Sequence, residues 1–102
     1  MKIFFTLSLA LLLFGCAAPK PPEPPRVSGD GSSFEQAVII QASNESAGVA
    51  AEYAWLRARY PIYRLQLQSL QQNGNRAYDR MDIVTPQGPR SVYFDISSFF
   101  GK

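Results

Sequence analysis

Few side chains in this sequence are of a type that performs acid–base, nucleophilic or metal chemistry. The 102 residues include one cysteine and no histidine, so the commonest general base and the commonest metal ligand are missing. Asp82 and Asp95 are the best candidates for a carboxylate pair of the glycosidase kind. The sequence also predicts that Asp95 lies opposite Arg80, which would keep it ionised and unfit as an acid. Ser97 and Ser98 have no histidine base to activate them. We therefore expect a protein that is not an enzyme and has no metal or cofactor.

The single cysteine, Cys16, follows an apolar segment and precedes a run of prolines. A lone cysteine cannot form an intramolecular disulfide, and no second ligand or redox partner accompanies it. The apolar segment, residues 3–14, would span about 18 Å as a helix, too short for a bilayer core of about 30 Å. Lys2, the short apolar segment and the small residues after it are typical of a secretory signal peptide.

Residues Leu13-Phe14-Gly15-Cys16 resemble the lipobox of bacterial lipoproteins. Leu13, Gly15 and Cys16 match the pattern, and Phe14 is bulkier than the residue usual at its position. The resemblance implies cleavage between Gly15 and Cys16, a diacylglycerol on the Cys16 sulfur and an acyl chain, such as palmitate, on the new amine. Two or more chains give stable membrane anchoring. Ala17, where an aspartate would mark retention, implies the periplasmic side of the outer membrane if the organism is Gram-negative.

Residues 16–33 are expected to form a lipid-anchored linker, after a signal peptide over residues 1–15. Five of the eight prolines lie between Pro19 and Pro25, and such a run favours an extended polyproline helix of about 3.1 Å per residue. We expect it to hold a domain about 20 Å from the membrane. The alternative is a ligand for an SH3-like partner, since the run contains PxxP spacing. Gly29-Asp30-Gly31 lacks the lysine of a phosphate loop and is assigned to the linker.

The remaining residues, 34–102, are predicted to form one small α+β domain of order β-α-β-β-β. An apolar run predicts a short buried strand within 34–41. The segment 47–60 is predicted to be a helix, because its apolar residues recur at helical spacing. That expected inner face consists of Val49, Tyr53, Leu56 and Tyr60, with Glu52 pointing away from it.

Alternation of apolar and polar residues predicts three further strands, in an antiparallel meander with the helix packed on it. They cover residues 62–71, 76–85 and 90–97. A four-residue loop over 86–89 would pair Ile83 with Val92 and Arg80 with Asp95. A three-residue loop over 73–75 would pair Leu67 with Met81. The partner of the first strand is left open.

This arrangement gathers polar and aromatic side chains on the sheet face away from the helix. Tyrosine and arginine are frequent in binding hot spots, although an ordinary solvated face would have a similar composition. The candidate partner-binding surface consists of Arg64, Tyr78, Arg80, Tyr93, Asp95 and, from the helix, Trp55. The net charge is only +2 and there is no basic run, so we do not expect nucleic-acid binding.

These observations favour a lipid-anchored envelope lipoprotein with a small domain that binds a protein or supports an assembly. The alternative is an inhibitor or immunity-type lipoprotein that blocks an envelope-active enzyme such as a cell-wall hydrolase. An enzyme that acts on cell-wall sugars is the third and weakest hypothesis.

Overall fold

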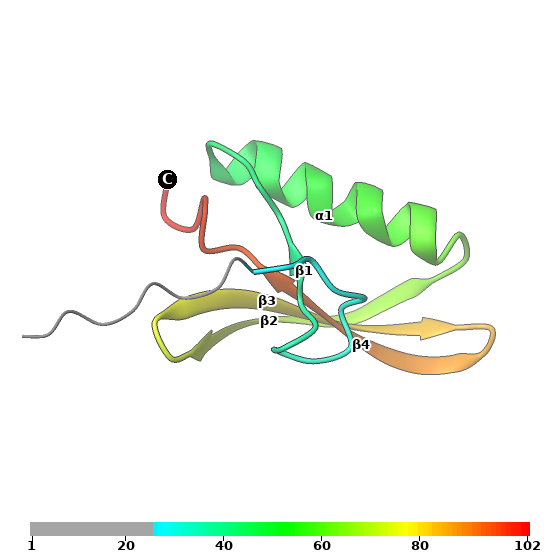
Figure 1. Ribbon diagram of the computed structural model, residues 1–102. Helices are drawn as coiled ribbons and strands as arrows, with labels where there is room; N and C mark the ends of the chain where they lie inside the picture. The colour runs from blue at the N-terminus through cyan, green and yellow to red at the C-terminus, as the bar shows by residue number, and fades with distance from the viewer. Residues whose placement is uncertain (1–25) are drawn as a thin grey trace, which may run out of the picture.

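The computed structural model describes residues 26–102, in which one helix covers one face of a four-stranded mixed sheet (Figure 1). The predicted α+β class is therefore confirmed. Cys16, the lipobox and the prolines before residue 26 lie outside the described residues. Within residues 26–102, no helix is long and apolar enough to cross a membrane. The elements are β1 (Val38–Ile39), α1 (Glu45–Arg59), β2 (Arg64–Asn73), β3 (Arg76–Thr85) and β4 (Gly88–Asp95).

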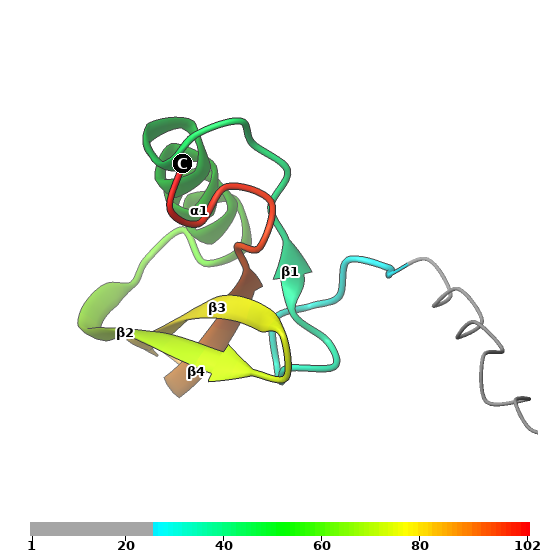
Figure 2. The ribbon, with the colours of Figure 1, turned by 90° about the vertical axis from the view of Figure 1, so that its left-hand side faces the viewer.

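The strands lie in the order β1-β4-β3-β2. The sheet differs from the predicted three-stranded meander because β1 joins it as a fourth strand, parallel to β4. β1 and β2 thus form opposite edges, and α1 connects them on one side of the sheet (Figure 2). Since β1 has only two residues, most of the exposed edge belongs to the ten-residue β2.

The β3–β4 hairpin closes with a two-residue loop, so the predicted four-residue loop is wrong. Thr85 pairs with Gly88, and its hydroxyl donates to the Gly88 carbonyl at 2.8 Å. Arg80 consequently pairs with Tyr93 and not with Asp95. The shift is two residues, which leaves every side chain on its expected face, because the side-chain period of a strand is two.

The β2–β3 hairpin also has a two-residue loop, with Asn73 opposite Arg76 and Gly74 at a φ of +64°, a conformation that glycine adopts without strain. The irregularity lies further along the strand, between Leu65 and Leu67. There a bulge gives Leu67 the partner Asp82, so the predicted Leu67–Met81 pair is wrong. Gln68 takes the place opposite Met81, and Leu67 moves to the outer face, where it is 57% exposed.

The core lies between α1 and the sheet and continues under the C-terminal turn. Its buried apolar members are Val38, Ile40, Leu56, Ala77, Met81, Ile83, Val92, Phe94, Ile96 and Phe99. The helix buries Gly48, Glu52 and Leu56, so the predicted inner face was rotated by about one residue. A Cβ atom on Gly48 would lie 2.4 Å from the Phe99 ring, and the glycine is what lets this ring pack against the helix.

Two polar contacts fix the start of the helix. Asn44 caps it, because its side-chain oxygen accepts a hydrogen bond from the Ala47 amide at 2.9 Å. Glu45 accepts a hydrogen bond from the Gly101 amide at 2.9 Å. This second contact ties the C-terminal turn to the first turn of α1, where Figure 1 shows the C-terminus.

The segment before β1 runs beside the β1 and β4 side of the sheet (Figure 2), and its Phe34 reaches the face turned away from the helix. Gly31 accepts a hydrogen bond from the Tyr93 amide at 2.7 Å, and its missing side chain leaves room for Val92 and Val38. The Phe34 ring lies 4.9 Å from that of Tyr78 and 4.8 Å from that of Tyr93. Residues 26–33, expected to be the end of the linker, thus lie against the domain.

Candidate functional site

Asp95 is the most strongly paired charge on the outer sheet face, the face turned away from the helix. It is 1% exposed and accepts hydrogen bonds from Arg76 Nε at 2.7 Å and from the Ser97 amide at 3.0 Å. Arg26 Nη2 lies 3.1 Å from the same carboxylate. Burial raises the pKa of Asp95, but Arg76 and the hydrogen bonds from Ser97 outweigh it and leave the pKa below its usual value. Asp95 is therefore ionised and structural.

The N-terminal segment also covers part of the predicted partner-binding surface. Tyr78 is 3% exposed, with its hydroxyl 3.3 Å from Arg26 Nη2 and its ring against Phe34. Trp55 lies on the other side of the sheet, half-buried, with its ring edge-on to Phe94 at 5.6 Å. The structure therefore does not bring the six candidate residues together on one exposed surface. Those that remain accessible on the outer face are Arg64, Arg80 and Tyr93.

Arg80 belongs to a network of outer-face side chains that hydrogen-bond to one another. Its Nε donates to Asp82 Oδ1 at 2.9 Å, and the Ser91 hydroxyl donates to the same oxygen at 2.7 Å. The guanidinium also lies 5.7 Å from the centre of the Tyr93 ring. The hydrogen bonds from Ser91 and Arg80 lower the pKa of Asp82. Asp82 and Asp95 are thus both held ionised, and neither is suited to act as a general acid at neutral pH.

The helix side of the sheet holds a carboxyl group, Glu52, in a different state, next to a second one, Asp79. Glu52 is completely buried, and neither of its carboxylate oxygens has a hydrogen-bond partner. Burial, followed by a hydrogen bond with Asp79 and the charge of Asp79, raises its pKa to about 9. Glu52 is thus protonated at neutral pH, and its hydroxyl can donate to the Asp79 carboxylate.

A short polar chain connects Asp79 to the surface. Gln68 donates through Nε2 to Asp79 Oδ2 at 3.5 Å and accepts at Oε1 from the Tyr53 hydroxyl at 3.2 Å. Gln68 is on this side of the sheet only because of the bulge next to Leu67. Burial, followed by the charges of Tyr63 and of the two carboxyl groups, raises the pKa of Tyr53.

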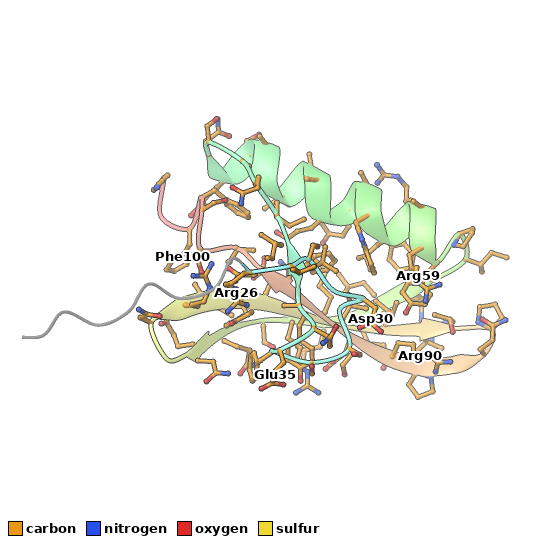
Figure 3. All side chains as sticks on the ribbon, viewed as in Figure 1. Arg26, Asp30, Glu35, Arg59, Arg90 and Phe100 are labelled. Carbon is orange, nitrogen blue, oxygen red and sulfur yellow. The ribbon has the colours of Figure 1, made fainter. Side chains whose placement is uncertain are left out.

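Asp79 forms part of the wall of a groove of about 200 Å³ between the helix, β2 and the C-terminal turn. We call it the Asp79 groove. Most of its other lining is apolar, and the residues are Glu45, Val49, Leu70, Ile96, Phe99 and Phe100. Leu70 is 51% and Phe100 41% exposed. Figure 3 shows Phe100 near the C-terminal end of the chain, beside the start of the helix.

The groove opens beside the free edge of the sheet. β2 is the last strand in the sheet order, and its sequence RLQLQSLQQN has one charged residue, Arg64. Exposed edges are normally protected by lysines, prolines or inward-pointing charges, and β2 has none of these beyond Arg64. Leu67 and Leu70 add exposed apolar side chains on its two faces. We call this strand border the β2 edge.

The sequence did contain a signal for Asp79. Alternation places it with Met81 and Ile83 on the inner face of β3, where a carboxylate is unusual. Glu52 precedes the buried Leu56 by one helical turn, but its charge favoured an outward position. Among residues 26–102, no cluster of three or more acidic, cysteine or histidine side chains is placed to hold a metal ion.

Comparisons with protein-family models, with curated proteins and with solved structures found no match to this chain.

Proposed function

We propose that this chain is a lipid-anchored bacterial envelope protein without enzymatic activity, whose domain binds a protein partner at the β2 edge. The observation that carries the binding is the β2 edge itself: ten residues at the end of the sheet, with one charge and two exposed leucines. An extended peptide can add a strand to such an edge, with backbone hydrogen bonds supplying affinity and pockets supplying specificity.

The anchor is supported by the resemblance of Leu13-Phe14-Gly15-Cys16 to a lipobox. The prolines up to Pro25 would hold the domain away from the lipid headgroups and leave the β2 edge accessible. The absence of enzymatic activity is supported by the outer face, where Asp82 and Asp95 have lowered pKa values.

The binding surface is tested by site-specific photo-crosslinking in the native host. A photoreactive amino acid at Leu67 or Leu70 should give a discrete adduct with a second protein. Val27 is 82% exposed and precedes the sheet, so the same probe there should give none. An adduct of twice the chain mass would identify a second copy as the partner, and no adduct at positions 67 and 70 would contradict the proposal.

The anchor is tested separately with the Cys16→Ser variant and radiolabelled palmitate. The unmodified chain should take up label and fractionate with membranes, whereas the variant should do neither. Label uptake by the variant, or none by the unmodified chain, would contradict lipid anchoring without affecting the binding surface.

A further inference from the structure

An acidic pair without a cationic partner lies at the Asp79 groove: Asp79 lines the groove, and Glu52 is buried beside Asp79. Glu52 is 0% exposed and both of its oxygens lack partners, which is rare because a buried polar group without a hydrogen bond costs about 1–3 kcal/mol. Asp79 is 8% exposed and lines the groove, whereas Glu52 is not among the lining residues. Natural proteins retain such a destabilising pair mainly at functional sites, where the loss of folding stability is offset elsewhere in the molecule.

The rest of the groove determines what kind of group would fit. Val49, Leu70 and Ile96 supply apolar walls, and Phe99 and Phe100 supply aromatic ones, which attract cations. Calcium and magnesium ions prefer six or more oxygen ligands, which these walls do not offer. A long apolar stem that ends in an ammonium or guanidinium group matches both the walls and the acidic pair.

We propose that the Asp79 groove is a subsite for a lysine or arginine side chain of an extended partner peptide, with Glu52 and Asp79 as its counter-charge. This inference rests on the proposed function, because the peptide would be the strand added at the β2 edge.

The sheet register supports this route into the groove. Leu70 and Asp79 are cross-strand partners, and both line the groove. Strands in a sheet are about 4.8 Å apart, so a strand added at β2 would lie about 10 Å from Asp79. A lysine or arginine on the helix side of the added strand would extend over Leu70 toward Asp79.

Cation binding should also release a proton. The groups that face Glu52 are Asp79 from β3 and Tyr53 from its own helix, while the β4 residues on this side, Val92 and Phe94, are apolar. An ammonium group beside the pair favours the ionised form of Glu52. Affinity should therefore rise with pH until Glu52 ionises in the free protein.

The probes are two heptapeptides with blocked ends, in which threonine and valine alternate around a central lysine in one and norleucine in the other. They are titrated onto the isotopically labelled full chain in lipid nanodiscs, with binding followed by the amide resonances of Leu70, Ile96 and Phe99. We expect the lysine peptide to bind about tenfold more tightly, the effect of one favourable charge pair. Asp79→Asn should abolish this preference, and Glu35→Gln, which removes an exposed carboxylate near the outer face, should retain it.

The same peptide titration, repeated at several pH values, compares the unmodified chain with the Glu52→Gln variant. Affinity for the lysine peptide should rise severalfold between pH 6 and pH 8.5 in the first and stay constant in the second. A lysine side chain remains charged over this range, since its pKa is about 10.4.

The outcomes separate the two proposals. Equal binding of both peptides at the β2 edge would overturn the cation subsite and leave the proposed function standing. A lysine preference that survives Asp79→Asn would also overturn the subsite. Binding of neither peptide would overturn the subsite, and the proposed function would then be judged by its own crosslinking test.

Discussion

The two sides of the sheet each bury a carboxyl group, and they treat it in opposite ways. On the outer face, Asp95 has two arginines and a backbone amide within hydrogen-bond distance. On the helix side, Glu52 has no partner and faces a second carboxyl group. The pKa of Asp95 is consequently lowered, whereas that of Glu52 rises to about 9.

This difference separates a structural charge from a candidate functional one. Asp95 joins β4 to the start of β3 and to the N-terminal segment through Arg76 and Arg26. Glu52 faces only a second acidic side chain, Asp79, within residues 26–102, and it costs stability when it ionises. Residues with strongly perturbed pKa values are frequent at functional sites, which is why we place the cation subsite beside Glu52.

The largest effect is expected from removing the paired carboxylate. Asp95→Ala should lower the free energy of unfolding by about 3 kcal/mol, the low end for a broken buried ion pair, because both arginines remain about one-third exposed. Urea unfolding followed by circular dichroism measures this. Asp82→Ala, at a half-exposed pair, is the matched control and should cost under about 1 kcal/mol.

Removing the unpaired carboxyl should act in the opposite direction. Glu52→Gln should raise the free energy of unfolding by about 2 kcal/mol at pH 8, because it removes the cost of keeping an ionisable group buried. The same urea experiment measures it. A loss of stability at pH 8 would mean that Glu52 has a partner that compensates its burial.

The pH dependence of stability should reveal the same contrast. A raised pKa means that the folded state binds more protons between the usual value of 4.5 and about 9, so the Glu52 contribution is fully present below pH 4.5 and is lost as the pH rises to 9. The slope is at most about −1.4 kcal/mol per pH unit. Asp95 acts at the acidic end, where its lowered pKa makes stability fall as the pH drops below about 4.

Thermal unfolding between pH 3 and pH 9 should therefore show a maximum near pH 4–5. Glu52→Gln should flatten the alkaline side and leave the acidic side unchanged. An alkaline decline that persists in this variant would assign the effect to a group other than Glu52.

The smallest effect is expected on the exposed network of the outer face. Arg80→Gln should change the free energy of unfolding by under about 1 kcal/mol, since exposed ion pairs contribute little. It should also leave photo-crosslinking from Leu70 unchanged. A clear loss of the Leu70 adduct would move the partner-binding surface from the β2 edge to the outer face.

Local patterns predicted the elements better than their register. Alternation located β2, β3 and β4, but a shift of two residues leaves every side chain on the same face, so it could not distinguish Arg80–Asp95 from the observed Arg80–Tyr93 pair. The bulge before Leu67 lies within a strand of regular pattern, and only the packing of the whole sheet determines it.

The Asp79 groove was not predicted from the sequence, because the acidic pair at this groove, Glu52 and Asp79, is buried where charged side chains are usually exposed. Glu52 was expected to face solvent, since carboxylates are almost never buried without a partner. Glu52 shares the buried face of the helix with Gly48, against which the Phe99 ring packs. Contacts between residues so far apart in the sequence are not encoded in local periodicity.

The most direct test is a carbon-13 NMR titration of the Glu52 side-chain carboxyl in the unmodified full chain. We predict a midpoint near pH 9 for Glu52, and for Asp95 a midpoint below the usual value of about 3.9 for aspartate. A Glu52 midpoint between pH 4 and pH 5 would show that the carboxyl is solvated or paired with a cation, and would contradict the buried acidic pair on which the cation subsite depends.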